Sequence, residues 1–300
     1  MIQALRERAN LYRQIRSFFY QRDVMEVDAP VMSSAAISDV HIETLGVPTV
    51  MGERYLHTSP EFYLKRCLVE GSGDIYSLGS VFRDEEEGHQ HRIEFTMLEW
   101  YRTDFTLEAL MNEVAELVES VLTIRATEFI SYAQAFERWA GVDVVNASAM
   151  ELKQAYLDLG GAEVVGVEED DRDLWEQLVL TEHVEPRLGQ DRMTFLTHFP
   201  ARQAALARVK NGWAQRFELY VHGVELANGY DELQDASEHR RRFELDQQAR
   251  EKLGRIQRPL DELFLSSLER GLPECCGVAL GVDRLLMMKM NAKHIAEVRD

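Results

Sequence analysis

The sequence predicts an α+β fold in which an antiparallel sheet is flanked by helices. Two pairs of strand-like segments, 75–83 with 94–102 and 217–221 with 224–230, each return across a short polar connection. Helical patterns separate these pairs instead of alternating regularly with single strands, which favours α+β over a parallel α/β fold. We find no internal repeat, low-complexity tract or flexible linker, so we expect one domain over residues 1–300.

The first segment predicts an amphipathic helix, because Leu5, Tyr12, Ile15 and Phe19 recur at helical spacing. A short strand follows from Val24 to Val27, and the proline of Asp28-Ala29-Pro30 ends it.

A second strand is expected at 54–58, directly before a helix start. In Ser59-Pro60-Glu61 we expect Ser59 at the N-cap and Pro60 at the first helical position. Leu64 and Leu68 continue the apolar face of that helix.

The middle of the chain is predicted to be mainly helical. Residues 107–122 form one helix, with Leu110, Val114, Leu117 and Val121 facing inward. Residues 124–190 are expected to form a mostly helical insertion on the rim of the main domain. The acidic run from Glu168 to Asp171 is typical of a solvated loop or a helix start and not of a metal site.

The last third contains a hairpin, a charged helix and a glycine-rich strand. His222-Gly223 is the predicted turn of the hairpin, and the helix runs from Ser237 to about Leu253. The strand at 277–281 then leads into a final helix, and its glycines permit close approach of a ligand to the backbone.

Composition excludes several classes of protein. The 33 basic and 52 acidic residues give a net charge of −19, which disfavours a long nucleic acid as the partner, tRNA included. The three cysteines, Cys67, Cys275 and Cys276, lack the spacing of a zinc site or a disulfide framework. No apolar run approaches the ~18 residues that a membrane span needs, and no signal core opens the chain. We expect a cytoplasmic protein.

The first candidate site is the connection after Arg83. An arginine at a strand end, followed by the polar loop 84–93, is well placed to bind a phosphate through two hydrogen bonds. Phe95 on the returning strand offers a flat surface for a purine ring. A surface hairpin held together by ion pairs explains the same residues without a ligand.

The second candidate is a pair of carboxylates. Glu225 interrupts an otherwise apolar strand, and a buried carboxylate needs a cation or an ion pair. Glu232 can bring a second carboxylate to the same place. Two carboxylates suit Mg²⁺ and equally suit a substrate ammonium, and a structural ion pair with an arginine is the third possibility.

The third candidate is the glycine-rich strand with Arg284 beyond it. Together the three segments supply two arginines, two carboxylates, an aromatic surface and a bare strip of backbone. Activation of an amino acid by ATP requires such a set, because the carboxylate must be aligned with the α-phosphorus and charge on the phosphates neutralised.

These segments resemble the three signature motifs of class II aminoacyl-tRNA synthetases. The similar stretches are Val27-Asp28-Ala29-Pro30, then Phe82-Arg83-Asp84-Glu85 with Glu94-Phe95, and Gly281-Val282-Asp283-Arg284. The lysyl branch is indicated by Thr58-Ser59-Pro60-Glu61, Arg216-Phe217-Glu218 and Glu225-Leu226-Ala227-Asn228-Gly229.

Within that branch the chain is most similar to the elongation factor P–(R)-β-lysine ligase family. Lysyl-tRNA synthetases carry an anticodon-binding barrel before the catalytic domain, whereas this chain begins close to the catalytic domain, so no anticodon-binding domain is expected. The resemblance implies that ATP activates lysine or β-lysine as an adenylate, which is then passed to a lysine side chain of elongation factor P. It also implies Mg²⁺ as a cofactor and a homodimer.

The resemblance also implies roles for individual residues. Catalysis is assigned to Arg83 and Arg284, on the α- and γ-phosphates. Substrate contacts are assigned to Ser59, Pro60, Glu61, Tyr101 and Glu232. The residues assigned to ATP are Arg83, Asp84, Glu85, Arg92, Phe95, Glu225, Leu226, Gly281 and Arg284, and those assigned to Mg²⁺ are Glu225 and Glu232.

The sequence departs from the family at several positions. Arg92-Ile93 replaces the usual Asn-Pro, Asp84 stands for an asparagine, and Ala279 stands where lysyl-tRNA synthetases usually have glycine. Two alternative functions remain: a lysyl-tRNA synthetase-like enzyme that charges tRNA or releases the adenylate, and a catalytically inactive regulatory paralogue.

Overall fold

The computed structural model describes residues 1–164 and 169–299 and divides into two compact units. Unit 1 comprises residues 1–110, 120–122 and those from 231 onward, and unit 2 comprises 111–119 and 123–230. Each unit combines a mostly antiparallel sheet with helices, which confirms the predicted α+β class. Helix α3 (Leu107–Val121) contributes residues to both units.

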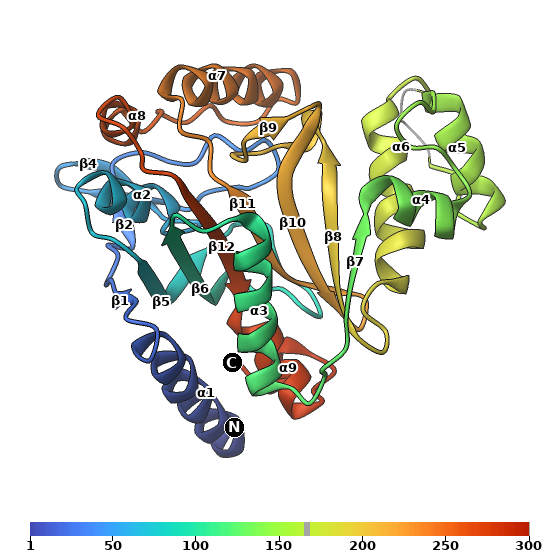
Figure 1. Cartoon of the computed structure of the whole chain (residues 1–300). Coiled ribbons are helices and arrows are strands. Elements are labelled where there is room, and N and C mark those ends of the chain that lie inside the picture. The colour runs from blue at the N-terminus through green and yellow to red at the C-terminus, as the bar shows by residue number, and fades with distance from the viewer. Residues whose placement is uncertain (165–168, 300) are drawn as a thin grey trace. The chain divides into compact units, whose positions relative to one another are not determined.

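The sheet of unit 1 has the strand order β1-β5-β6-β12 (Figure 1). Its strands are β1 (Met25–Glu26), β5 (Ile75–Phe82), β6 (Glu94–Thr103) and β12 (Cys275–Gly281). The β5–β6 and β6–β12 pairs are antiparallel, and β1 runs parallel to β5. The predicted strands 75–83 and 94–102 are thus confirmed, whereas the strand predicted over 24–27 is only two residues long.

Helix α1 (Ile2–Tyr20) covers one face of this sheet, as its apolar spacing predicted. Phe19 stacks on Tyr76 of β5 with ring centroids 4.4 Å apart, and it meets Trp100 of β6 edge-on at 5.4 Å. Leu5 is the exception to the predicted apolar face, because it is exposed. Since side chains alternate along a strand, Glu99 and Tyr101 point to the face opposite α1.

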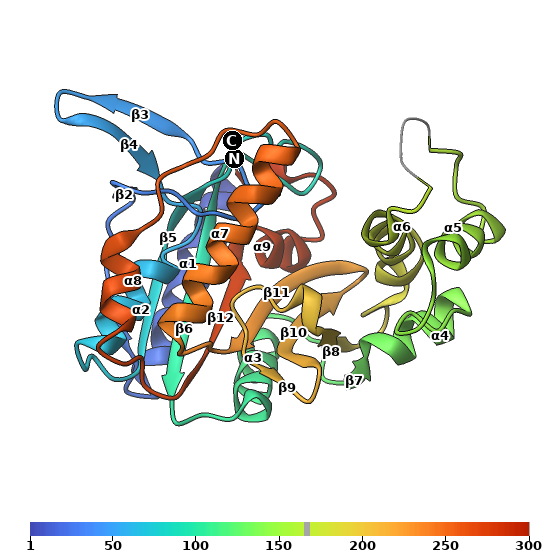
Figure 2. The same cartoon turned by 90° about the horizontal axis from the view of Figure 1, so that it is seen from above.

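A second, small sheet in unit 1 has the order β2-β4-β3. It consists of β2 (Met32–Ser33), β3 (Gly46–Thr49) and β4 (Gly52–Leu56). The hairpin of β3 and β4 extends outward from the rest of the unit (Figure 2), and Val50 and Met51 at its tip are exposed. The strand expected at 54–58 therefore begins and ends two residues earlier.

Three further helices of unit 1 pack against one another through aromatic rings. They are α2 (Glu61–Val69), α7 (Ala236–Lys252) and α8 (Glu262–Leu268). Phe62 stacks on Phe264 at 4.3 Å, and Phe243 of α7 lies 5.6 Å from Phe62. Leu64 and Leu68 are buried, as predicted, and α7 matches the charged helix expected near 237–253.

The loop before β3 is fixed by the buried guanidinium of Arg250 on α7. It donates to the carbonyl oxygens of Asp39 at 2.7 Å and Ile256 at 3.0 Å, and to the carboxylate of Glu43 at 2.6 Å. Only 1% of Arg250 is exposed, so these acceptors replace the water it loses on folding.

The two ends of the described chain meet in unit 1 (Figure 2). Arg8 of α1 donates to the carbonyl oxygen of Val298 at 2.9 Å and also contacts Asp283 at the start of α9 (Val282–Met290). Arg299 lies 3.5 Å from the other oxygen of Asp283.

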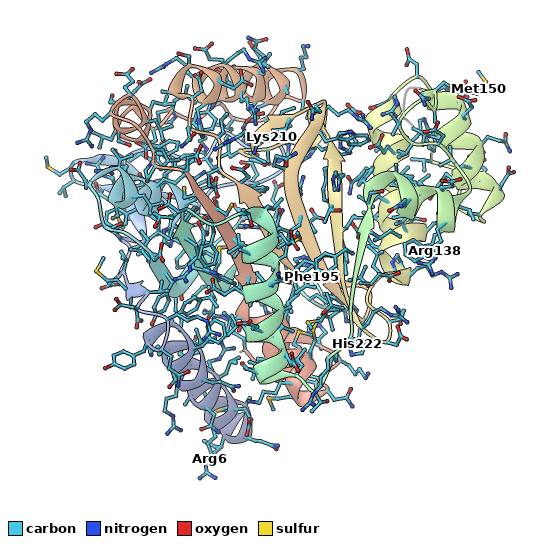
Figure 3. The ribbon with its side chains drawn as sticks, in the orientation of Figure 1. Arg6, Arg138, Met150, Phe195, Lys210 and His222 are labelled. Atoms are coloured by element: carbon cyan, nitrogen blue, oxygen red, sulfur yellow. The ribbon has the colours of Figure 1, made fainter. Side chains whose placement is uncertain are left out.

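Unit 2 contains the sheet order β7-β8-β10-β11, with β9 paired to β10. Phe195 of β8, labelled in Figure 3, stacks on Phe129 of β7 at 5.2 Å. The predicted hairpin is confirmed: His222 and Gly223 form its turn, and both have positive φ, which matches the twist of the strands. The strands are β7 (Thr127–Ser131), β8 (Met193–Pro200), β9 (Val209–Lys210), β10 (Trp213–Val221) and β11 (Val224–Asp231).

The helices of unit 2 surround their own buried core of aromatic side chains, which includes Tyr132, Phe136, Trp175 and Phe199. Of the predicted acidic run, Glu168 lies outside the described residues, and Asp171 caps α6 by accepting from the amide of Leu174. The remaining elements are α4 (Tyr132–Ala140), α5 (Ala149–Asp158), α6 (Arg172–Val179), the single π turn η1 (Leu180–Val184), and the 3₁₀ turns η2 (Glu185–Arg187), η3 (Ala201–Gln203) and, in unit 1, η4 (Ile295–Glu297).

None of the described helices combines sufficient length with sufficient apolar character to cross a bilayer.

Candidate active site

The start of α2 places Ser59, Pro60 and Glu61 on the side of the sheet to which Glu99 points. The helix begins at Glu61, with Pro60 at the N-cap, one residue later than predicted. Ser59 is therefore not the cap: its hydroxyl accepts from the amide of Glu61 at 3.0 Å and donates to the carboxylate of Glu99 at 2.6 Å. The side chain expected to end the helix instead orients an acid on β6.

A fully buried lysine joins two further carboxylates. Lys65 lies one turn after Glu61 on α2, and its Nζ is 2.5 Å from Glu61 Oε1 and 2.6 Å from Glu232 Oε2. We call Glu61, Glu99 and Glu232 the carboxylate cluster. Glu99 and Glu232 are 3% and 1% exposed, so the cluster is screened little by solvent.

Tyr101 and Gly277 form one wall of this cluster. Tyr101 donates to Glu99 Oε1 at 2.7 Å, and its register partner on β12 is Gly277. A β-carbon on Gly277 would lie 2.3 Å from the Tyr101 ring and 2.4 Å from Glu232 Oε1. Only glycine leaves room here for both side chains.

Burial of these acids close together shifts their pKa values. Burial, together with the nearby Glu61, raises the pKa of Glu99 to about 7. Burial also raises the pKa of Glu232 to about 8, although Lys65 opposes the shift. Burial alone would lower the pKa of Lys65, but Glu232 and Glu61 outweigh it, so the lysine stays charged. The three carboxylates can therefore carry more negative charge than Lys65 alone neutralises.

Sequence reasoning missed Glu99 and Lys65. The sequence does give an indication for Glu99, because it is an acid in the otherwise apolar strand segment before Tyr101. It lies two residues from Tyr101, so the two side chains point to the same face of the strand. Lys65 has no such indication, since a lysine between Leu64 and Arg66 looks like an ordinary surface residue of a helix.

Arg83 lies at the other end of β5, next to the predicted aromatic platform. Its guanidinium is 5.2 Å from the centre of the Phe95 ring, and its Nε donates to the carbonyl oxygen of Thr58 at 3.4 Å. Its Nη1 faces Glu86 across 3.7 Å, which is longer than a hydrogen bond. The side chain is thus held in place and keeps donors for a ligand.

Arg284 meets the loop after Arg83. It lies on the first turn of α9, and its guanidinium is 2.5 Å from His91 Nε2. Burial, Arg284 and Arg83 together lower the pKa of His91, so both arginines lie near the same imidazole. The predicted convergence of the two cations at positions 83 and 284 is consistent with this geometry.

Asp283 positions Arg284. Its carboxylate accepts from the amide of Thr96 on β6 at 2.7 Å and pairs with Arg8 and Arg299. Since only 2% of Asp283 is exposed, this anchor fixes the start of α9 against the sheet.

The other loop residues predicted for ATP lie close to Arg83 in the chain. The amide of Asp84 donates to the carbonyl oxygen of Glu43 at 2.9 Å. Glu85 has a positive φ of 64° and lies 3.7 Å from Arg255. Arg92 pairs loosely with Glu87 at 3.4 Å. A β-carbon on Gly281 would meet only Arg284, at an ordinary distance of 3.6 Å.

Glu225 and Leu226 belong to unit 2, on β11. Glu225 acts electrostatically on the half-buried Arg216 and the buried Glu218 of β10, which form an ion pair. Arg216 also donates to the side-chain oxygen of Asn228 at 3.2 Å. The predicted pairing of Glu225 with Glu232 on one Mg²⁺ stays a prediction.

Within the described residues, no group of three or more His, Cys, Asp or Glu side chains is arranged to hold a metal. Of the two predicted metal ligands, Glu232 already uses Oε2 in its ion pair with Lys65. Its surroundings therefore favour an ammonium over a divalent cation, one of the alternatives that the sequence left open.

Comparison with known families agrees with this geometry. The family model of tRNA synthetases class II (D, K and N) matches residues 1–300. The chain belongs to the class II tRNA synthetases. The predicted resemblance and fold are confirmed by this match.

Several close relatives within the class II synthetase family carry one name, elongation factor P–(R)-β-lysine ligase. The protein of Hamiltonella defensa is 44% identical over 99% of this chain and 94% of its own length. The proteins of Proteus mirabilis and Edwardsiella ictaluri are 45% and 46% identical, each over 98% of this chain and 93% of their own. This class II synthetase chain thus spans nearly the full length of these ligases.

Proposed function

We propose that this chain is an ATP-dependent ligase that activates (R)-β-lysine as its adenylate and transfers it to a lysine side chain of elongation factor P. The names of its relatives support the substrate and the acceptor. The class II family supports the use of ATP. The single observation that carries the proposal is the division of unit 1 into two ends: a carboxylate cluster around Lys65 and an arginine pair around His91.

The two ends are separated along β6. Tyr101 marks the carboxylate end and Phe95 the arginine end, six residues apart, which corresponds to roughly 20 Å along an extended strand. A diamino acid with its ammonium groups at the first end directs its carboxylate towards the second. ATP stacked on Phe95 would present its phosphates to Arg83 and Arg284.

The first step joins the amino acid carboxylate to the α-phosphorus of ATP. One carboxylate oxygen attacks, the bond between the α-phosphorus and the bridging oxygen breaks, and pyrophosphate leaves. Arg83 stabilises the negative charge that grows at the α-phosphate, and Arg284 that on the leaving group. Glu225 and Glu232 are the residues predicted to hold Mg²⁺, which would supply neutralisation of part of the phosphate charge.

The second step transfers the acyl group. The amine of an elongation factor P lysine attacks the carbonyl carbon of the adenylate, loses a proton and forms an amide, and AMP leaves. A class II synthetase of this kind is expected to act as a homodimer, and the acceptor implies a cytoplasmic location. Single-domain organisation, with 124–190 as an insertion, belongs to the same proposal.

ATP–pyrophosphate exchange with (R)-β-lysine and with α-lysine tests the first step, and transfer to elongation factor P or to tRNA tests the second. We expect exchange with (R)-β-lysine to be faster and elongation factor P to be the acceptor. Efficient charging of tRNA would instead establish a synthetase, and exchange with neither amino acid would establish an inactive paralogue.

A further inference from the structure

We propose that Arg255, in the segment after α7, is a positioning residue for ATP, because it holds the carboxylate of Glu85 in place at the start of loop 84–93. This role rests on the proposed function, in which Glu85 contacts ATP. Arg255 lies in none of the three motifs that predicted the ATP residues, and it reaches the loop from a distant part of the chain.

The end of α7 fixes the point at which the Arg255 side chain leaves the backbone. The helix is followed by Gly254, which has a positive φ of 67°. The amide of Gly254 donates to the carbonyl oxygen of Glu251 at 3.0 Å. The next amide, that of Arg255, donates to the carbonyl oxygen of Arg250 at 2.9 Å. These two hydrogen bonds form a Schellman motif, so the backbone of Arg255 is fixed against the last turn of the helix.

Glu43 orients the guanidinium of Arg255. Arg255 Nη1 lies 2.9 Å from Glu43 Oε1, and Nη2 of the buried Arg250 lies 2.6 Å from the same oxygen. The Glu43 side chain is only 14% exposed, so these pairs are screened less than pairs at the surface. Glu43 therefore fixes the direction of Arg255, while part of the guanidinium stays accessible because 31% of that side chain is exposed.

The same glutamate is joined to the ATP loop through its backbone. The amide of Asp84 donates to the carbonyl oxygen of Glu43 at 2.9 Å, and the two residues form an antiparallel bridge. Glu85 comes next, with a positive φ of 64° that residues with a β-carbon seldom adopt. Its amide donates to the side chain of Asp84 at 3.0 Å, which holds this turn. The start of the loop thus lies beside the pair of Glu43 and Arg255.

The distance between Arg255 and Glu85 suits a group that must still bind a ligand. Arg255 Nη1 lies 3.7 Å from Glu85 Oε2, which is longer than a hydrogen bond. Attraction at this distance restricts the directions in which the carboxylate points, while its oxygens can still accept from ATP. Since 69% of the Glu85 side chain is exposed, it would otherwise sample several rotamers. A carboxylate that is oriented in advance loses less freedom when the nucleotide binds.

The three consecutive acids of the loop differ in where their arginine partners come from. Glu86 faces Arg83 at 3.7 Å, and Glu87 pairs with Arg92 at 3.4 Å, so both partners lie within the loop or next to it. The partner of Glu85 comes from the segment after α7. This pair therefore connects the ATP loop to a separate part of unit 1, whereas the other two connect the loop to itself.

Michaelis constants in pyrophosphate exchange test the role of Arg255. Arg255→Met should raise KM for ATP about 5-fold, the size expected for a partly exposed ion pair, and change kcat and KM for the amino acid less than about 2-fold. Arg255→Lys keeps the charge and should return KM for ATP to within about 2-fold of the unaltered protein. No rise in KM for ATP in Arg255→Met would overturn the proposal.

Arg258→Met is the matched control. Arg258 lies in the same segment, but it donates to the carbonyl oxygen of Thr44 at 3.3 Å and lies over the ring of Tyr55. The control should change KM for ATP less than about 2-fold. An equal rise in Arg258→Met and Arg255→Met would assign the effect to the segment as a whole and refute the positioning role.

A double-mutant cycle with Glu85→Gln separates positioning from a general structural effect. Glutamine at position 85 has no charge for Arg255 to attract, so adding Arg255→Met should raise KM for ATP less than about 1.5-fold further. The same rise of about 5-fold in both backgrounds would contradict the proposal, because Arg255 would then act independently of Glu85.

Titration calorimetry with ATP alone distinguishes a failure of this role from a failure of the proposed function. Absence of exchange with either amino acid in the unaltered protein would refute the proposed function. If that protein still binds ATP, Kd replaces KM in the same cycle: coupled effects of the two substitutions would support the positioning role, and additive effects would refute it. Absence of ATP binding by the unaltered protein would refute both.

Discussion

Tyr101 packs directly on the bare backbone of Gly277, its register partner across β6 and β12. A β-carbon at position 277 would lie 2.3 Å from the Tyr101 ring and 2.4 Å from Glu232, so this one glycine admits both side chains to the carboxylate cluster. The position of Tyr101 and Glu232 in the cluster therefore depends on the absence of a side chain at residue 277.

Gly277→Ala should therefore impair substrate binding more than stability. The new methyl group displaces Tyr101 or Glu232, and we expect KM for the amino acid in pyrophosphate exchange to rise at least ~10-fold, since overpacking costs about 1–3 kcal/mol. Gly46→Ala on β3 is the matched control, because its β-carbon meets the carboxylate end of the exposed Glu53, a side chain that can adjust in solvent. Equal effects of both substitutions would contradict this account.

Arg83→Ala should abolish most of the adenylation activity. The loss of one preorganised charge contact at the α-phosphate costs over ~100-fold in pyrophosphate exchange. Arg138→Ala provides the comparison, since Arg138 also lies near an aromatic ring and a carboxylate but points outward from α4 in unit 2 (Figure 3). Near-normal exchange by Arg83→Ala would show that another group neutralises the phosphate.

His91 should make ATP binding sensitive to acid. Burial and Arg284 lower its pKa below the ordinary 6.5, so the folded protein favours the neutral imidazole that accepts from Arg284. The stabilisation by this contact is present above pH 6.5 and is lost as the pH falls through the lowered pKa.

KM for ATP is accordingly expected to rise as the pH falls below 6.5, because a protonated His91 repels both Arg284 and Arg83. His91→Gln keeps an acceptor that does not titrate and should flatten this part of the profile. An identical acid limb in the variant would assign the titration to another group.

Arg250→Met should destabilise unit 1 through the loop before β3. It removes the donor that Glu43 shares with the carbonyl oxygens of Asp39 and Ile256. Arg255 still pairs with Glu43 at 2.9 Å, so we expect a loss of about 1–3 kcal/mol, the cost of unsatisfied buried acceptors. Denaturant unfolding measures the change. Arg241→Ala, which removes an exposed pair with Glu238, should change the free energy of unfolding by less than about 1 kcal/mol.

The sequence predicted most elements of the fold because their apolar spacing is local information. The two strands around the 84–93 loop, the His222-Gly223 turn and the helices near residues 2–20 and 237–253 all follow from neighbours in the chain. Element ends were less certain: Ser59 lies one residue before the N-cap, because its hydroxyl is committed to Glu99 and Glu61.

The chemistry of the site was only partly predictable. Arg83 and Arg284 were found because they follow recognisable strands, and their shared neighbour His91 is consistent with that assignment. Lys65 and Glu99 were missed because their roles depend on strand register and on burial between distant segments. No local pattern distinguishes a buried lysine on a helix from a surface one.

The ion pairs of Arg8 and Arg299 with Asp283 have a consequence for the preparation of recombinant protein. Both ends of the described chain are fastened to the residue next to Arg284, so an affinity tag or a trimmed terminus is not a neutral change. A change that loosens either end should first weaken the binding of ATP near Arg284. Recombinant versions of the protein that differ only at their termini can therefore differ in apparent affinity for ATP.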